Sequence, residues 1–475
     1  MKSLASNAIY NILYKSLNVL FPLITIAYVS RVLTPIGVGK VASAQNIVSY
    51  FVIVASLGLP TYGVKKIAEC YDNKVICSKV FSELAIINAV STIICIMAYL
   101  SMVFSLPYFE DKTTISLIVG IHLFANIFNI DWFYQGREEY KYIMLRSFFV
   151  KLLALIAVFA FVHKTEDYIV YALIITLSTV SNFAFNIAKL PQYVKLQWKG
   201  LEIEHHLKPV LILLATTISI EIYTLADTTM LTLLKGDEIV AYYTNSSKTI
   251  GITRVMIASA CAVFLPRLNY YISHGQKEDF NILSSKGIYM LLTFSLPAAL
   301  GLVLLADDFT FILFGKDFEP SILSMRILAL SVITVAISNF TGYQILVSLG
   351  KEKIVLYSTI LGAVVNVLLN ASLIIPFAQY GAATASVITE LIVALYQLYY
   401  VKKLIPLTLS KSVLVQIVGP LVAMAIIIVA VKCVNLNIIV EALLSCILGS
   451  FIYLCFGLCT GNETIMQIKR KIINK

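Results

Sequence analysis

Residues 354–389 read IVLYSTILGAVVNVLLNASLIIPFAQYGAATASVIT and contain no charged side chain. A membrane-spanning helix needs about 20 apolar residues to cross the hydrocarbon layer, so this stretch is long enough for two helices. Pro376 interrupts it, and Gly381 follows shortly after. Both residue types disfavour a continuous helix. The stretch therefore predicts a hairpin of two membrane helices joined by a very short turn.

The rest of the chain has the same apolar character. Apolar residues make up 59% of the 475 residues and charged residues 13%, whereas about 25% of a typical soluble domain is charged. Further charge-free windows lie at residues 84–109, 168–188, 287–306, 327–350, 412–431 and 442–462. The composition predicts an all-α polytopic membrane protein, because helices satisfy their own backbone polar groups in lipid.

Hydropathy predicts about fourteen transmembrane helices. They lie at residues 9–30, 38–60, 80–105, 115–134, 147–163, 168–188, 209–234, 239–264, 287–305, 322–346, 354–375, 380–400, 412–431 and 438–459. Twelve is the alternative, because 147–163 is short and 209–234 contains Glu221 and Asp227. The loops between them are too short for a soluble domain. Any function must therefore reside within the membrane helices or at their ends.

Basic residues in the loops predict the orientation, because cytoplasmic loops carry an excess of Lys and Arg. Twenty-four fall on one side, at residues 2, 65, 66, 74, 79, 137, 141, 146, 189, 195, 199, 208, 267, 277, 286, 351, 353, 402, 403, 411, 469, 470, 471 and 475. Seven fall on the other, at residues 31, 40, 112, 164, 235, 316 and 432. This asymmetry places both termini in the cytoplasm. It also suggests that the basic residues behind the net charge of +10 face anionic membrane lipid. The sequence has no separate basic domain that could bind nucleic acid.

The same orientation places residues 128–141, FNIDWFYQGREEYK, at the cytoplasmic end of the fourth predicted helix. Tryptophan and tyrosine are enriched where a helix leaves the membrane. We therefore expect Trp132 and Tyr134 to be interfacial anchors and Gly136 to lie in the turn that follows.

A faint internal repeat relates two halves of the chain. Each half has a second helix that contains a small polar run and ends in Leu-Pro: SAQN at 43–46 with Leu-Pro at 59–60, and YTNSS at 243–247 with Leu-Pro at 265–266. The offset of six helices predicts two parallel repeats. The expected organisation is one six-helix bundle at 1–208, a second at 209–403, and two extra helices with a basic tail at 404–475.

Charged residues inside the predicted spans are candidate functional residues, because each costs about 2.5–3.5 kcal/mol to insert. The cations Lys15, Lys248 and Arg254 lie in the first and eighth helices, and Arg31 lies at the outer end of the first. If the halves face each other, these residues line a cationic central cleft. Such a cleft suits an anionic substrate, because ammonium and guanidinium groups pair with phosphate oxygens.

Four acidic or amide side chains are candidates for charge pairing or for a coupling ion. Glu221 and Asp227 lie in the seventh helix, and Asn366 and Asn370 lie one turn apart in the eleventh. Asparagines at this spacing also bond commonly across helices. The eight cysteines have no metal-site spacing, so we predict no metal site and no cofactor, and leave coupling to Na⁺ or H⁺ open.

Several motifs together resemble one family, the polysaccharide-repeat-unit flippases (Wzx) of the multidrug/oligosaccharidyl-lipid/polysaccharide (MOP) exporter superfamily. The motifs are Arg31-Val-Leu-Thr-Pro with Gly37 and Gly39, Leu57-Gly-Leu-Pro-Thr-Tyr-Gly63-Val-Lys65, Asp131-Trp-Phe-Tyr-Gln-Gly136 with Glu139 and Lys141, Leu265-Pro-Arg267, Leu313-Phe-Gly315 with Phe318, Gln344, Gly350-Lys-Glu-Lys353, and Gly381-Ala-Ala383 with Thr389-Glu390. Their order and spacing carry the resemblance.

The resemblance implies a fold of two six-helix bundles with alternating access. It implies a substrate of undecaprenyl diphosphate carrying an oligosaccharide, for O-antigen or capsule synthesis at the bacterial inner membrane. It supports Lys15, Lys248 and Arg254 as contacts to diphosphate or acidic sugars, and by position favours Asp227 and Asn366 as sodium ligands. Asp131 and Gln135 would belong to a gate or a structural turn. A polymerase and a chain-length regulator are possible partners.

Two other functions are weighed against a flippase. A drug or metabolite antiporter of the same fold would favour an acidic cleft, whereas cations dominate the first and eighth helices. A membrane polysaccharide polymerase or acyltransferase would need paired catalytic groups, and the five histidines are scattered along the chain. We therefore predict a transporter and not an enzyme.

Overall fold

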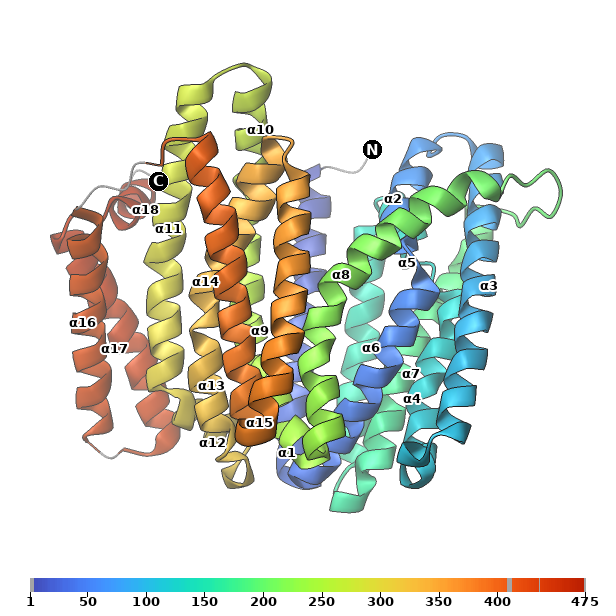
Figure 1. The fold of residues 1–475 in the computed structure, drawn as a ribbon, viewed down its shortest axis with the longest axis horizontal. Helices are drawn as coiled ribbons and strands as arrows, with labels where there is room; N and C mark the ends of the chain where they lie inside the picture. Colours follow the sequence, from blue (N-terminus) through green and yellow to red (C-terminus); the bar gives the residue numbers. More distant parts are fainter. Residues whose placement is uncertain (1–3, 408–411, 435, 474–475) are drawn as a thin grey trace. The chain divides into compact units, whose positions relative to one another are not determined.

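The computed structural model describes residues 4–407, 412–434 and 436–473, and all regular elements in these ranges are helices (Figure 1). The chain divides into two compact units, residues 1–232 with 236–241, and residues 233–235 with 242–475. Unit 1 contains α1 (Leu4–Ser56), α2 (Leu59–Glu69), α3 (Lys74–Ser105), η1 (Pro107–Lys112), α4 (Thr113–Ala125), η2 (Asn126–Phe128), α5 (Asp131–Gly136), α6 (Tyr140–Phe161), η3 (Thr165–Asp167), α7 (Tyr168–Lys189), η4 (Leu190–Gln192) and most of α8 (Glu204–Lys235).

Unit 2 contains the remaining helices. They are α9 (Asp237–Ala262), whose first turn belongs to unit 1, α10 (Leu265–Ser273), α11 (Lys277–Leu304), α12 (Ala306–Leu313), η5 (Lys316–Phe318), α13 (Ser321–Ala329), α14 (Ser331–Asn339), η6 (Phe340–Leu346), α15 (Glu352–Leu404), α16 (Ser412–Lys432), α17 (Ile438–Cys459) and α18 (Glu463–Ile473). The predicted boundaries at residues 208 and 403 follow the sequence repeat and stay a prediction.

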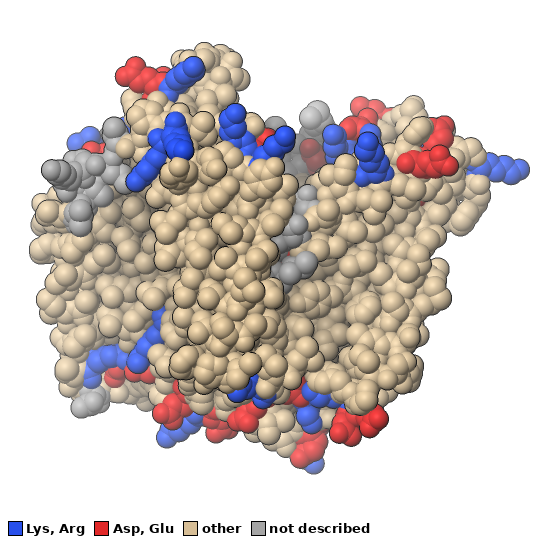
Figure 2. All heavy atoms as spheres, viewed as in Figure 1, with Lys and Arg blue, Asp and Glu red and all other residues tan. Residues whose placement is uncertain are grey.

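The prediction of a polytopic helical membrane protein is confirmed. Ten segments of the described chain are long and apolar enough to cross a membrane. Two of them are longer than one span. Phe21–Glu69 has 49 residues and contains the predicted span 38–60 with the end of 9–30, and Glu352–Leu404 has 53 residues and contains the predicted spans 354–375 and 380–400. On the face shown in Figure 2, charged side chains gather at the two ends of the helices, and the surface between them is almost free of charge. This belt matches a lipid-facing surface.

The hairpin predicted at 354–389 is confirmed. Ala378 interrupts α15 with φ 48° and ψ −127°, between Pro376 and Gly381. A Cβ atom on Gly381 would lie 2.2 Å from the carbonyl oxygen of Leu373, so only glycine allows the two legs to approach this closely. Thr34 interrupts α1 in the same way, with φ 60° and ψ 172°.

The two Leu-Pro pairs of the sequence repeat have the same structural role. Leu59-Pro60 begins α2, and Leu265-Pro266 begins α10. Proline suits the first turn of a helix, because its missing N–H would have no partner there. Each pair therefore ends a membrane helix and starts a short helix.

The interfacial positions predicted for Trp132 and Tyr134 are wrong. Trp132 is 4% exposed and Tyr134 is fully buried, in a core that includes Phe81 and Phe133. The predicted helix at 115–134 is also not continuous, because α4 ends at Ala125 and α5 begins only at Asp131. The aromatic side chains therefore hold α5 inside unit 1 and do not face lipid.

Glycines explain how α5 packs so closely on α2. A Cβ atom on Gly63 would lie 2.5 Å from the Trp132 ring, and one on Gly136 would lie 2.8 Å from Ile67 Cβ. Gly136 is thus a packing residue at the end of α5, and the expectation that it forms the turn is wrong. The turn that follows contains Glu138, with φ 55°.

Candidate functional site

The predicted cleft cations have different surroundings. Lys248 is exposed on α9, and Arg254 lies two turns further on with a guanidinium that donates to Ser331 Oγ. Arg31 is exposed on α1 and donates to the carbonyl oxygen of Ala27 at 3.1 Å. The side chain of Lys15 lies outside the described residues. That these cations meet in one cleft remains a prediction.

Asp227 is a buried residue of α8, 4% exposed, that acts electrostatically on Tyr50 of α1. A polar seam joins α8 to the second half of α1. In it, Asn46 Nδ2 donates to Thr229 Oγ1 at 2.7 Å, and the hydroxyls of Tyr50 and Thr229 are 2.9 Å apart. One turn further on, Thr232 Oγ1 donates to Ser43 Oγ at 3.2 Å (all within unit 1). The SAQN run therefore forms the α1 side of this seam.

The other candidates for an ion site form hydrogen bonds with residues one turn away on the same helix. Asn370 Nδ2 donates to Asn366 Oδ1 at 3.0 Å, and both residues are buried in α15. Glu221 accepts from the hydroxyl of Thr224 at 3.0 Å. The structure places Asp227 in unit 1 and the two asparagines in unit 2, and a shared ion site stays a prediction.

Asp131 forms a buried ion pair that the sequence analysis missed. Arg146 Nη2 lies 3.1 Å from Asp131 Oδ1, and the Arg146 side chain is only 3% exposed. Arg146 also donates to Asn182 Oδ1 at 3.0 Å and to Asn186 Oδ1. Our assignment of Arg146 to a basic loop is wrong, because it lies in the second turn of α6. Asp131 therefore ties α5 to α6 and α7.

Gln135 lies one turn after Asp131 in α5 and is half-buried. Its backbone carbonyl accepts from the Glu138 N–H at 3.0 Å, at the turn that ends this helix. A gating role for Asp131 and Gln135 remains a prediction.

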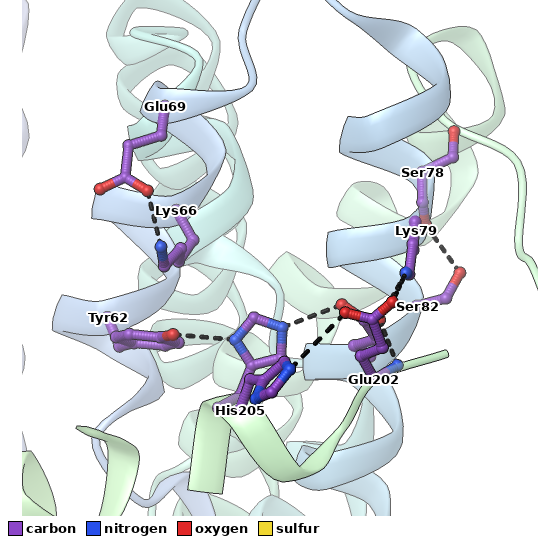
Figure 3. Close-up of polar contacts among 10 residues, drawn as sticks. Tyr62, Lys66, Glu69, Ser78, Lys79, Ser82, Glu202 and His205 are labelled. Carbon is purple, nitrogen blue, oxygen red and sulfur yellow. Dashed lines mark hydrogen bonds and ion pairs between the residues drawn. The ribbon is translucent and has the colours of Figure 1, made fainter. Parts of the chain in front are cut away.

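A second buried polar cluster lies where α2, α3 and α8 meet (Figure 3). His206 Nε2 lies 2.9 Å from Glu83 Oε2, and His206 Nδ1 lies 2.8 Å from the Tyr62 hydroxyl. Glu83 is 2% and His206 8% exposed. In the neutral imidazole one ring nitrogen donates and the other accepts, so an Nε2–H that donates to the Glu83 carboxylate leaves Nδ1 to accept from the Tyr62 hydroxyl. Both ring nitrogens of His206 are thus partnered.

An ion pair covers this cluster on its exposed side. Lys79 Nζ lies 2.8 Å from Glu202 Oε1 and 4.0 Å from Glu83 Oε1. The Lys79 ammonium holds the pKa of Glu202 below its ordinary value, mainly through this hydrogen bond. The segment before α8 is thereby held beside α3.

The Arg31-Val-Leu-Thr-Pro motif forms one wall of a cavity on unit 1. The cavity measures about 330 Å³ and is lined by Leu33, Thr34, Ile36, Gly37, Lys40, Thr165, Glu166 and Tyr168. Lys40 Nζ lies 4.8 Å from the centre of the Tyr168 ring. The volume is at the lower end of the range for small-molecule sites, which begins near 300 Å³.

Comparison with known proteins shows the family to which the chain belongs. A family described as "Polysaccharide biosynthesis protein" matches residues 4–272, which is more than half of the chain. The chain belongs to this family. A second family, MatE, matches residues 213–372.

Full-length relatives agree with this assignment. This polysaccharide biosynthesis protein is 26% identical over 397 residues to a "Putative O-antigen transporter" of Shigella dysenteriae, covering 81% of the chain and 96% of the relative. It is 22% identical over 406 residues to the protein of the same description from Escherichia coli strain K12, covering 84% and 97%. The fold is similar to that of the lipid II flippase MurJ in an inward closed conformation, with a TM-score of 0.73, 14% identity and coverage of 99% and 100%.

The motifs that carry the family resemblance are largely packing elements in this polysaccharide biosynthesis protein. Gly63 and Trp132, from two different motifs, contact each other. The sequence analysis missed Glu83 and His206, although one signal was present. Glu83 is an acidic residue at the start of the predicted span 80–105, and such a residue needs a partner.

Proposed function

We propose that this protein is a flippase for undecaprenyl-diphosphate-linked oligosaccharide repeat units. It would move the sugar head group from the cytoplasmic to the outer face of the bacterial inner membrane for O-antigen or capsule synthesis, while the lipid tail stays in the bilayer. The observation that carries the proposal is the match over 81% and 84% of the chain to proteins described as O-antigen transporters. The similarity in fold to a lipid II flippase adds support.

The proposed mechanism is alternating access through a cationic cleft. Lys248 and Arg254 are the described candidates for diphosphate contacts, because both lie on α9 within the candidate membrane span Asp237–Ser273. Lys15 and Arg31 would contribute from α1. Asp227, which is buried on α8, would serve as a charge partner or as part of a Na⁺ or H⁺ site.

A multidrug or metabolite antiporter is the second candidate. The match of residues 213–372 to the MatE family favours it. The two described cations on α9 disfavour it, since a cleft for cationic drugs needs acidic groups. The polymerase and chain-length regulator of the same pathway are proposed partners.

A deletion strain tests the proposal. Undecaprenyl-linked glycans are extracted, and a reagent that cannot cross the membrane reports which face they occupy. We expect single repeat units to accumulate on the cytoplasmic face and surface polysaccharide to be lost. Normal surface glycan would indicate an efflux role, and unpolymerised units on the outer face would indicate a polymerase. Either result would overturn the flippase proposal.

A further inference from the structure

An arginine directly after α5 is held in place by two tyrosine rings. Arg137 is half-buried, and its guanidinium carbon lies 4.7 Å from the centre of the Tyr71 ring and 4.9 Å from the centre of the Tyr193 ring. Tyr71 lies in the turn between α2 and α3, and Tyr193 directly follows η4. Arg137 is therefore fixed at a point where three segments of unit 1 meet.

The Arg137 guanidinium has no acidic partner. Two other cations of unit 1 are paired: Arg146 lies 3.1 Å from Asp131, and Lys189 lies 3.9 Å from Glu139. Within residues 4–407, 412–434 and 436–473, no carboxylate forms an ion pair with Arg137. The two rings thus hold a cation whose charge no side chain of the described ranges neutralises.

Most N–H groups of Arg137 are also unused. A guanidinium has five N–H donors. One of them donates to the carbonyl oxygen of Tyr71 at the long distance of 3.4 Å, and the Cys77 thiol beside it is a weak partner. The Nε atom is buried without a hydrogen-bond partner among the residues that the structure describes. The rings therefore fix the orientation of a guanidinium that still has donors to offer.

The surroundings of Arg137 suit a phosphate group. A guanidinium that stacks on aromatic rings is already oriented, and its planar fork of donors matches two phosphate oxygens. A second cation lies beside the same ring, because Lys189 Nζ is 5.5 Å from the centre of Tyr193. Tyr71 is 41% exposed, so the site is open at the surface of unit 1.

The position of the site along the helices indicates the kind of ligand. Tyr71 follows the candidate membrane span Phe21–Glu69, Tyr193 follows Thr165–Gln192, and Arg137 precedes Tyr140–Phe161 by three residues. All three residues lie on the side that the loop charges predict to face the cytoplasm. Lipid phosphates lie at this level of a bilayer, and basic side chains attract them there.

We propose that Arg137, held by Tyr71 and Tyr193, is a binding site for the phosphate group of a membrane lipid at the cytoplasmic surface, with Lys189 as a second cation. Two lipids can supply this group: the diphosphate of the lipid-linked substrate, and the head group of an anionic phospholipid. The first source rests on the proposed function and would make the site a docking point before the sugar crosses. The second source is independent of it.

Binding to the full-length protein in detergent tests the proposal, with undecaprenyl diphosphate and phosphatidylglycerol as separate probes. Arg137→Gln removes the charge. Arg267→Gln is the matched control, because it removes the same charge from the same predicted side of the membrane. Arg267 also lies near two tyrosine rings, but it is exposed and donates to the Tyr271 hydroxyl at 3.1 Å. An unchanged thermal unfolding temperature shows that a variant is folded.

We expect Arg137→Gln to weaken binding of at least one probe about tenfold, through loss of a charge-assisted hydrogen bond. Arg267→Gln should change binding by less than about twofold, as for an exposed charge. Weaker binding of undecaprenyl diphosphate assigns the site to the substrate, and weaker binding of phosphatidylglycerol alone assigns it to phospholipid. Unchanged binding of both probes by Arg137→Gln, or equal weakening by the two variants, would overturn the proposal.

Protection of the unsubstituted protein gives an answer even if Arg137→Gln misfolds. Phenylglyoxal modifies accessible arginine side chains, and mass spectrometry reports the extent at each position. A bound probe should slow the modification of Arg137 and leave that of Arg267 unchanged. Equal effects on both arginines, or an Arg137 that does not react even without a probe, would contradict a ligand site. Normal surface glycan in the deletion strain would count against the proposed function alone, because these binding measurements need no transport.

Discussion

The contact between Gly63 and Trp132 leaves no room for a methyl group. Gly63→Ala would place a Cβ atom 2.5 Å from the indole ring, so the ring or α2 must shift. Overpacking of this kind costs about 1–3 kcal/mol. We therefore expect Gly63→Ala to lower the thermal unfolding temperature in detergent. The double variant Gly63→Ala with Trp132→Leu should recover part of the loss.

Gly251 provides the matched control for this prediction. It lies in α9 with open space around its Cβ position. Gly251→Ala should therefore be neutral or stabilising by about 0.5–1 kcal/mol, since alanine is the better helix former. If both glycine variants are equally destabilised, the cause is the helix backbone and not the tryptophan.

The ion pair between Asp131 and Arg146 leads to a second prediction about single residues. Arg146→Met removes the cation and leaves a partly buried carboxylate without it, which costs about 3–5 kcal/mol in buried pairs. We expect a clear loss of thermal stability, and recovery when Asp131→Asn is added. If Asp131 is part of a gate, the stable double variant will fail to restore surface polysaccharide. A double variant as unstable as Arg146→Met would show that the pair itself is not the cause.

Single elements were predicted well where local sequence decides them. The hairpin of α15 was predicted because Pro376 and Gly381 break a charge-free run. The short helices α2 and α10 were unexpected, although Leu-Pro marks their first turn in both cases. The break in the fourth helix was missed, because the segment Asn126–Phe128 is uncharged and hydropathy does not reveal that the helix type changes there. Hydropathy alone does not distinguish an apolar residue that faces lipid from one in the protein core. Trp132 was misplaced for this reason.

Charges at one end help to attach α16 and α17 to the other helices of unit 2. Lys432 Nζ, at the end of α16, lies 2.7 Å from Asp307 Oδ1 and 3.0 Å from Asp308 Oδ2. Burial acts to raise the pKa of Asp307, but Lys432 outweighs it and the pKa is lowered. Burial dominates at Asp308, whose pKa is raised. The two carboxylates therefore contribute to stability with opposite dependence on pH.

The pairing by Lys432 should be lost in acid. A lowered pKa means that Asp307 stabilises the fold above the ordinary aspartate pKa, about 3.9, and that this contribution disappears as the pH falls through the lowered value. We expect Lys432→Met to reduce stability by about 1 kcal/mol near neutral pH, with a difference that shrinks below about pH 4 and vanishes below the lowered pKa of Asp307. Thermal unfolding from pH 3 to 7 measures it. The exposed Lys402→Met should show no such pH dependence.

At the scale of the whole molecule, our prediction concerns the effect of the cationic residues of α9 on transport. A charge-assisted hydrogen bond contributes about 1.5–3 kcal/mol, and 1.4 kcal/mol corresponds to a factor of ten. We expect Lys248→Met with Arg254→Met to reduce delivery of repeat units at least about tenfold without loss of thermal stability. Lys277→Met, on an exposed helix end, is the control. A stable double variant with the normal rate would remove α9 from the substrate path.

The site could be predicted from the sequence only in part. Lys248 and Asp227 could be named as candidates because a charge in an apolar span is conspicuous, and their roles stay a prediction. Glu83 and His206 were missed because they lie far apart in the sequence, and Arg146 was missed because it was assigned to a loop. His206 and Glu83, for example, are 123 residues apart. Hydropathy shows which residues are costly to bury, and only the fold shows which partners offset that cost.

The attachment of α8 at both ends has a consequence for how the protein is made. A chain emerging from the ribosome inserts its helices in order, and the first six are complete near residue 192. At that moment Glu83 has no imidazole beside it, and Ser43 and Asn46 face no threonine from α8. The first bundle can therefore reach its final packing only after the seventh helix has entered the membrane. A nascent chain arrested shortly before residue 204 would be a better substrate for membrane quality-control proteases than one arrested after residue 241.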